Sequence, residues 1–295
     1  MKFAKARGAA FALAVTARPR QWIKNLVPLA VPVAGAQIGS LAIMGRTVLM
    51  VMSLCLASAS TYLVNDAHDA ALDRMHPTKR FRPVAAGKLS RRTAACVGLL
   101  VGLLALVIST PLGPRASAVL LGYLFNSLLY TYLLKQIPIL DVLTIASGFL
   151  LRAIAGGVVS GVEISPWFLL VTVFGSLFLA FGKRFGELKE MGSKSPNHRL
   201  TLELYDSAFL QQMLTFSQTG VSIAFCLWAI QYPTNGRSFS PVSLSIGPFL
   251  FVVMRLSMLL MSGKGTDPAE LFYLDRILQL GTLVLCAVLV GSIYL

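Results

Sequence analysis

The stretch Val97-Gly-Leu-Leu-Val-Gly-Leu-Leu-Ala-Leu-Val-Ile108 contains no charged or hydrogen-bonding side chain. It forms the centre of an apolar run, 93–111, and roughly 20 apolar residues suffice for a helix that crosses the hydrocarbon core of a bilayer. Similar runs occupy most of the remaining chain, at 26–44, 47–64, 116–134, 138–159, 165–182, 208–230, 241–262 and 273–295. The sequence therefore predicts an all-α integral membrane protein with about nine transmembrane helices.

The composition supports a membrane protein. The 295 residues are 56% hydrophobic and 13% charged, whereas a soluble domain carries about 25% charged residues. Because the spans use nearly the whole chain, we expect one membrane-embedded domain, 1–295, in contact with the lipid bilayer. The net charge of +14 would favour nucleic-acid binding in a soluble protein. Here the cations fall in short loops, so we expect anionic ligands and no nucleic acid.

The distribution of lysine and arginine predicts the orientation in the membrane. Most of the 26 cationic residues lie in the amino-terminal segment and in the loops after spans two, four, six and eight. The opposite loops hold only Arg46, Arg115 and Arg237. By the positive-inside rule, the loops 65–92 and 183–207 and the amino terminus are cytoplasmic. An odd number of spans places the carboxyl terminus outside, and 1–25 is expected to be a basic, interfacial segment of a protein in a bacterial-type plasma membrane.

An acidic cluster follows the second span in Tyr62-Leu-Val-Asn-Asp-Ala-His-Asp-Ala-Ala-Leu-Asp73-Arg74. Asp66, Asp69 and Asp73 are spaced i, i+3, i+7 and share one face of a helix. Carboxylates so placed repel one another unless a cation lies between them, and Asn65 adds an uncharged oxygen ligand. Oxygen ligands suit Mg²⁺. A solvated helix end is the alternative, but the cluster ends a membrane span and continues into dense positive charge.

That positive charge is carried by Arg74, Lys79, Arg80 and Arg82. Cations beside a carboxylate-held metal suit a diphosphate, since the metal bridges some of its oxygens and arginine binds others. The positive-inside rule alone would explain the sign of the charge in this loop but not the adjacent aspartates. His68 and His76 lie nearby, and we expect them to form hydrogen bonds and not to bind metal.

These residues resemble the UbiA superfamily of intramembrane prenyltransferases. The family pattern Asn-Asp-x-x-Asp-x-x-x-Asp stands at Asn65 to Asp73, and Arg82, Pro83 and Gly87 follow where the family has Arg-Pro-x-x-x-Gly. The resemblance covers almost the whole chain. It implies a nine-helix bundle with a lateral lipid-facing groove, with acidic motifs after helices two and six.

Four further stretches resemble one branch, the decaprenyl-phosphate phosphoribosyltransferases of cell-wall arabinan synthesis. They are 18–25 (RPRQWIKN), 73–83 (DRMHPTKRFRP), 151–157 (LRAIAGG) and 182–188 (GKRFGEL). This resemblance implies 5-phosphoribosyl 1-diphosphate as donor and a polyprenyl phosphate, decaprenyl phosphate in that branch, as acceptor. The product would be polyprenyl-phosphoryl-5-phosphoribose, a precursor of cell-wall arabinose donors in arabinogalactan.

The stretch after the sixth span departs from the wider family. Aromatic prenyltransferases of this fold carry a second aspartate-rich motif there, whereas this chain has Lys183, Arg184 and Glu187. A donor with an additional 5-phosphate, meeting an acceptor that is itself a phosphate, requires more positive charge. The substitution therefore favours the phosphoribosyl branch, although membrane anchoring by the two cations is an alternative.

The resulting hypothesis is a Mg²⁺-dependent pentosyltransferase in which Asp66, Asp69 and Asp73 are catalytic. Departure of diphosphate gives ribose C1 oxocarbenium character, and the lipid phosphate attacks from the opposite face without a strong general base. Candidate phosphate or substrate ligands are Lys24, Arg74, Lys79, Arg80, Arg82, Arg152, Lys183, Arg184 and Glu187. Arg152 lies inside a span, where a charge is a functional candidate by default; an ion pair with Asp141 or another acid is the alternative.

Two other functions remain open on the sequence. An aromatic prenyltransferase of the same fold would transfer a prenyl group to 4-hydroxybenzoate or a related acceptor, and the missing second aspartate motif disfavours it. A non-enzymatic transporter or lipid scaffold would place its charges at broken helices near the midplane. Here the charged clusters gather at one interface, which fits an amphiphilic substrate better. The sequence leaves the tail length, the number of Mg²⁺ ions and the formation of a homo-oligomer undecided.

Overall fold

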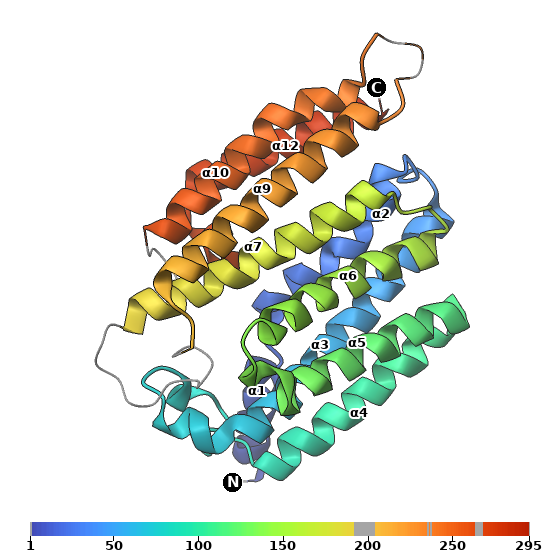
Figure 1. The fold of residues 1–295 in the computed structure, drawn as a ribbon. Coiled ribbons are helices and arrows are strands. Elements are labelled where there is room, and N and C mark those ends of the chain that lie inside the picture. The colour runs from blue at the N-terminus through green and yellow to red at the C-terminus, as the bar shows by residue number, and fades with distance from the viewer. Residues whose placement is uncertain (1, 192–203, 235, 237, 263–267, 295) are drawn as a thin grey trace. The chain divides into compact units, whose positions relative to one another are not determined.

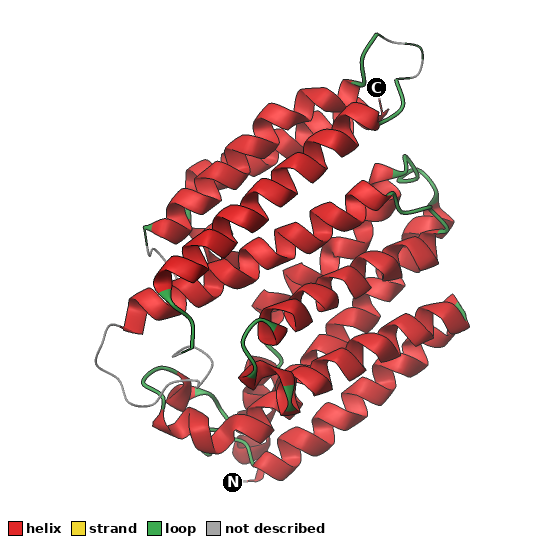
Figure 2. Ribbon diagram, in the orientation of Figure 1, coloured by secondary structure: helices red, strands yellow, loops and turns green. Residues whose placement is uncertain are grey.

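The structure is a computed structural model that describes residues 2–191, 204–234, 236, 238–262 and 268–294. Every regular element in these residues is a helix, and loops and turns connect them (Figure 2). The predicted all-α fold class is confirmed.

The contacts within the chain divide it into two compact units. Unit 1 comprises Met1–Pro32, Ile38–Lys135 and Leu151–Val162, and unit 2 comprises Val33–Gln37, Gln136–Leu150 and Glu163–Leu295. Each unit has its own apolar core. The α2 helix (Val27–Ala34), the η4 turn (Leu134–Gln136) and the α6 helix (Leu140–Ser160) each contribute residues to both units.

Unit 1 is built around one long helix, α3 (Leu41–Met75), which packs against α4 (Arg91–Ser109) and α5 (Pro114–Tyr132) (Figure 1). Its other elements are α1 (Lys2–Thr16) and the 3₁₀ segments η1 (Pro19–Leu26), η2 (Lys79–Phe81) and η3 (Thr110–Leu112). Serines begin two of the helices: the Ser40 hydroxyl accepts from the Ile43 amide at 3.4 Å, and the Ser90 hydroxyl accepts from the Thr93 amide at 3.0 Å.

Glycines let the helices of unit 1 approach closely. A Cβ at Gly98 would lie 3.1 Å from the Leu63 Cβ, and one at Gly102 would lie 2.8 Å from the Ser60 hydroxyl. Gly156 of α6 faces the backbone of α2, since its Cβ would lie only 2.5 Å from the Pro28 carbonyl oxygen. Small residues at such contacts are typical of membrane helices, which associate through close packing in lipid.

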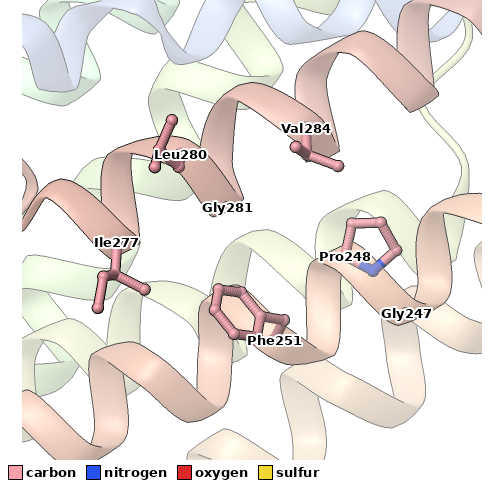
Figure 3. A pocket seen from close by; sticks show the side chains of 7 residues that line it. All are labelled: Gly247, Pro248, Phe251, Ile277, Leu280, Gly281 and Val284. Carbon is pink, nitrogen blue, oxygen red and sulfur yellow. The ribbon is translucent and has the colours of Figure 1, made fainter.

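Besides its parts of α2, η4 and α6, unit 2 contains α7 (Pro166–Met191), α9 (Ser207–Gln231), η6 (Pro241–Ser245), α10 (Ile246–Met261), α11 (Pro268–Leu274) and α12 (Arg276–Tyr294). Phe178, Phe181 and Phe185 of α7 fill its core with Leu210 and Leu214 of α9. An apolar pocket of about 350 Å³ lies between α10 and α12 (Figure 3). Its lining residues are Gly247, Pro248, Phe251, Ile277, Leu280, Gly281 and Val284. They suit hydrocarbon and offer no group that could hold a phosphate.

Seven helices of the described residues are long and apolar enough to cross a membrane. They are Leu41–Met75, Arg91–Leu112, Leu140–Ser160, Pro166–Lys189, Ser207–Gln231, Pro241–Met261 and Arg276–Tyr294. Large apolar side chains on them point outward; Leu100 and Leu103 are 65% and 60% exposed. A multi-span membrane protein is thereby confirmed. The exact number of nine spans is not confirmed, and the lateral groove for a lipid tail stays a prediction.

Two of the expected spans are absent from these seven. The run 116–134 corresponds to the 19-residue helix α5, which does not meet the same criterion of apolarity. The run 26–44 is wrong as a single helix, because α2 ends at Ala34 and α3 begins at Leu41. Pro32 lies inside α2 and lacks an amide donor, and Ala36 takes a left-handed φ of 55°.

The predicted loops begin as helices. The first, 65–92, starts inside α3, which continues to Met75, so the aspartates stand on a helix as their spacing indicated. The second, 183–207, starts inside α7, which continues to Met191, and 192–203 lie outside the described residues.

Gly156→Ala is expected to destabilise the protein by about 1–3 kcal/mol, because a methyl group would be forced against the Pro28 backbone. Gly122→Ala is the matched control, since its Cβ would meet only the Leu151 Cδ2 at 3.8 Å, an ordinary contact. The measurement is the midpoint of thermal unfolding of each purified, full-length variant in detergent. Equal midpoints for the two variants would contradict the packing described for unit 1.

Candidate active site

Three buried carboxylates stand on one face of α3. Asp66, Asp69 and Asp73 are 1%, 8% and 5% exposed and lie within about two turns of the helix. The helix has 35 residues, a length of about 52 Å at 1.5 Å per residue, and therefore exceeds the hydrocarbon core of roughly 30 Å. A helix of this length can cross the bilayer and still carry the aspartates in its final turns.

Arginines from two other segments of unit 1 neutralise this face. Nη1 of Arg82 donates to Oδ2 of Asp73 at 2.8 Å and to Oδ1 of Asp66 at 3.3 Å. Nη2 of Arg18 donates to the same Asp66 oxygen at 2.6 Å, and its guanidinium lies 4.7 Å above the centre of the Tyr62 ring. Arg18 adopts a left-handed φ of 51° at the start of η1. The loop after α3 and the segment before η1 are thus both tied to the aspartate face.

Asp69 has a separate set of partners. The ammonium group of Lys135 donates to its Oδ1, and this lysine is only 6% exposed. The His68 Nδ1 lies 2.9 Å from the same oxygen, and its ring packs edge-on against Tyr132 with centroids 4.7 Å apart. The buried Lys135–Asp69 pair joins η4, the 3₁₀ turn that follows α5, to α3.

The remaining predicted residues of unit 1 surround this face with different contacts. The side-chain oxygen Oδ1 of Asn65 accepts from the Thr131 hydroxyl at 3.3 Å. Arg74 is exposed and donates to the Ala85 carbonyl at 3.1 Å, and the exposed Arg80 lies over the Phe81 ring. Lys24 and Lys79 are half-buried.

Both histidines make the hydrogen bonds that the sequence predicted. His68 contacts Asp69 as described above. The His76 Nδ1 accepts from the backbone amides of Thr78 and Lys79, at 3.3 Å each. His76 therefore shapes the turn that leads from α3 into η2.

The aspartate face fits a hard cation by the chemistry of its donors. Among the residues described, no three His, Cys, Asp or Glu side chains already surround one metal position. However, a single positive nitrogen, Arg82 Nη1, is within hydrogen-bonding reach of both Asp66 and Asp73. One cation can therefore be shared by these two carboxylates, and their oxygen atoms are the ligands that Mg²⁺ prefers.

Arg152 lies in a second buried cluster of unit 1. Its Nε donates to Oδ1 of Asn25 at 2.8 Å, and its Nη2 donates to the Tyr123 hydroxyl at 2.9 Å. The Ser58 hydroxyl lies 3.1 Å from both the Asn25 oxygen and the Tyr123 hydroxyl. Because Asn25 belongs to η1, this cluster fixes the carboxyl-terminal end of the same segment that begins beside Arg18.

A third cluster lies in unit 2. Arg184 is 2% exposed; its Nε donates to Oδ2 of Asp141 at 2.8 Å, and its Nη1 donates to Oε2 of Glu187 at 2.7 Å. The Tyr205 hydroxyl donates to Oδ1 of Asp141 at 2.6 Å. Asp141, which the sequence offered as a partner for Arg152, thus binds Arg184 and Tyr205. Lys183, the other predicted cation here, is half-buried.

The sequence analysis did not name several participants as site residues, among them Arg18, Lys135, Tyr123 and Tyr205. Arg18 stands within a stretch already noted for its resemblance, which was a usable signal. Lys135 is 66 residues from Asp69, and Tyr205 is 64 residues from Asp141. No spacing rule connects residues so far apart along the chain.

Buried aspartates paired with arginine and lysine stand near the end of a helix that is long and apolar enough to cross a membrane, so the chain is an integral membrane protein with a charged site at the end of a span. Residues 25–274 match the UbiA prenyltransferase family, and the chain belongs to that family.

Curated relatives cover nearly the whole chain. The decaprenyl-phosphate phosphoribosyltransferase of Mycolicibacterium smegmatis is 37% identical over 288 residues, covering 94% of this chain and 91% of that protein. The protein of the same name from Corynebacterium glutamicum is 35% identical, covering 94% of this chain and 85% of its own length. Among solved structures, a UbiA homolog from Archaeoglobus fulgidus bound to GPP and Mg²⁺ superimposes with a TM-score of 0.74 at 16% identity, covering 96% and 99% of the two chains. This likeness shows that the fold is shared.

Lys135→Met is expected to destabilise the protein by roughly 3 kcal/mol, because Asp69 would keep a buried charge without its ammonium partner. Adding Asp69→Asn removes that charge, so the double variant should regain much of the lost stability. Lys88→Met, at an exposed position, serves as the control. Thermal unfolding of the purified proteins measures the effect, and additive losses in the double variant would contradict a buried pair.

Proposed function

We propose that this protein transfers 5-phosphoribose from 5-phosphoribosyl 1-diphosphate to a polyprenyl phosphate such as decaprenyl phosphate. Diphosphate is released, and the product is polyprenyl-phosphoryl-5-phosphoribose. The observation that carries the proposal is the shared contact of Arg82 with Asp66 and Asp73. A diphosphate held by a divalent cation needs carboxylates for the metal and guanidinium groups for the free oxygens, and this face supplies both within one cluster.

The names of the curated relatives support the same reaction, since both are decaprenyl-phosphate phosphoribosyltransferases that match this chain over 91% and 85% of their own lengths. The family match and the Mg²⁺ in the Archaeoglobus fulgidus structure support a metal at the aspartate face. The family match and the names of the relatives agree with the cluster of aspartates and arginines in unit 1, which by itself favours phosphate-bearing substrates.

The residues of unit 1 take distinct roles in this proposal. Asp66, Asp69 and Asp73, with Asn65, would hold Mg²⁺; when bound, it withdraws charge from the leaving diphosphate. Arg82 leaves the aspartates and binds diphosphate oxygens. The further cations that we propose as ligands of phosphate oxygens are Arg18, Lys24, Arg74, Lys79, Arg80 and Arg152. The acceptor phosphate is already ionised near neutral pH, so no strong general base is required.

Unit 2 supplies cations where aromatic prenyltransferases of the fold have aspartates. Arg184 is buried and oriented by Asp141 and Glu187, and Lys183 precedes it. These groups would bind the 5-phosphate of the donor or the phosphate of the acceptor, with Glu187 near the ribose hydroxyls. A buried arginine oriented by two carboxylates favours this role over simple anchoring in the membrane.

The proposal extends to the cellular setting. We place the chain in a bacterial plasma membrane with its amino terminus and both charged regions in the cytoplasm and its carboxyl terminus outside. The donor is a water-soluble metabolite and the acceptor a lipid, so the site must be open to both phases. One domain and a lateral groove for the tail follow from the same proposal; a homo-oligomer is compatible with it.

Transfer is tested with donor labelled in the ribose ring, offered with decaprenyl phosphate to the purified protein. We expect label in the lipid phase when Mg²⁺ is present and none when the metal is chelated. Transfer of a labelled prenyl group from a prenyl diphosphate to 4-hydroxybenzoate would instead identify an aromatic prenyltransferase. Absence of both reactions would favour a transporter or scaffold.

Asp73→Asn is expected to lower kcat/KM for this transfer by roughly 100-fold or more, because one carboxylate of the proposed metal site is lost. Asp73 is preferable to Asp69 here, since its partner Arg82 also contacts Asp66 and is not left without a carboxylate. Glu163→Gln, at an exposed position, is the control. A normal rate in a folded Asp73→Asn protein would remove this residue from the site.

A further inference from the structure

A continuous chain of hydrogen bonds runs through the buried cluster of unit 2. The amide of Ile139 donates to the Tyr205 hydroxyl at 2.6 Å, and that hydroxyl donates to Oδ1 of Asp141 at 2.6 Å. The other Asp141 oxygen, Oδ2, accepts from Nε of Arg184 at 2.8 Å. Because a hydroxyl has one hydrogen and here gives it to Asp141, the direction of every bond in the chain is fixed.

The tyrosine is held rigidly. It is 4% exposed, and its ring stacks on Phe209 at 5.9 Å between centroids with an angle of 12°. Burial and the hydrogen bond to Asp141 raise the pKa of Tyr205, so its hydroxyl stays a neutral donor. The carboxylate that it contacts is completely buried.

The backbone is strained at Ile139, where this series of hydrogen bonds begins. Ile139 has a φ of 70°, a left-handed conformation that a β-branched residue rarely adopts. Such a conformation persists only where the surroundings constrain it, and it is often found near functional sites. The Tyr205 hydroxyl is one of these constraints, since it accepts the hydrogen bond of the Ile139 amide.

We infer that Tyr205 is a positioning residue for Arg184: its hydroxyl fixes Asp141, and Asp141 fixes the guanidinium that binds a substrate phosphate. This inference rests on the proposed function. Arg184 is bonded through Nε to Asp141 and through Nη1 to Glu187, two donors that lie in one guanidinium plane. Rotation of Asp141 would tilt that plane and with it the other guanidinium donors. A hydroxyl bonded to Asp141 can therefore affect phosphate binding through Arg184.

Tyr205→Phe removes the hydroxyl and keeps the ring. We expect KM for one of the two substrates to rise about tenfold or more, the effect of losing one hydrogen bond to a charged group, while KM for the other changes little. The substrate affected is the one whose phosphate Arg184 binds. Tyr294→Phe is the matched control in the same unit, because its hydroxyl donates to the Val33 carbonyl at 3.1 Å, outside the cluster.

A double-mutant cycle distinguishes positioning of Arg184 by Tyr205 from a purely structural role of Tyr205. In an Arg184→Lys background, Tyr205→Phe should raise KM no further, since the guanidinium that it orients is gone. Additive effects would overturn the inference, as would unchanged KM values for both substrates. The inference would also be overturned if Tyr205→Phe lowered kcat only to the extent that it lowered the midpoint of thermal unfolding.

The inference and the proposed function fail separately. If the wild-type protein and Tyr294→Phe transfer no label, the proposed function is wrong. Binding of inorganic phosphate, measured by calorimetry without Mg²⁺, then still tests the role of Tyr205. Weaker binding by Tyr205→Phe than by Tyr294→Phe supports positioning of Arg184, and equal binding overturns it.

Discussion

Three carboxylates within two turns of one helix, all almost completely buried, constrain the rest of unit 1. An isolated buried charge costs several kcal/mol, and like charges in proximity add to that cost. Asp66 and Asp73 are therefore bound by Arg82, Asp66 also by Arg18, and Asp69 by Lys135. These cations come from three different segments, so the start of η1, the loop after α3 and the η4 turn must all converge on one helix face.

Solvent exposure distinguishes the cations that neutralise these aspartates. Arg82 is about one quarter exposed at its side chain, whereas the aspartates it contacts are nearly inaccessible. Under the proposed function, the partly solvated Arg82 would be the guanidinium group that binds phosphate oxygens. Lys135 is far more buried and is better suited to holding Asp69 in place.

Unit 2 satisfies a buried acid in a related way. Asp141 is enclosed by Arg184 and Tyr205, so each carboxylate oxygen has a donor. In unit 2 the Asp141 carboxylate orients the Arg184 guanidinium, whereas in unit 1 the arginines and the lysine neutralise the three aspartates. In both units glycine allows the close helix packing that such clusters need: Gly102 meets Ser60 in unit 1, and Gly220 meets the Phe174 ring in unit 2.

The sequence by itself determined the membrane class, most of the spans and the aspartate face, because apolar length and helical spacing are local properties of the chain. It also identified Arg82 and Arg184, which stand in short charged stretches. It did not determine the break at Ala36, where prolines and a left-handed residue end α2 early. Only the tertiary structure paired Lys135 with Asp69 and Tyr205 with Asp141. Buried charges select their partners by proximity in space, and these partners are more than sixty residues apart along the chain.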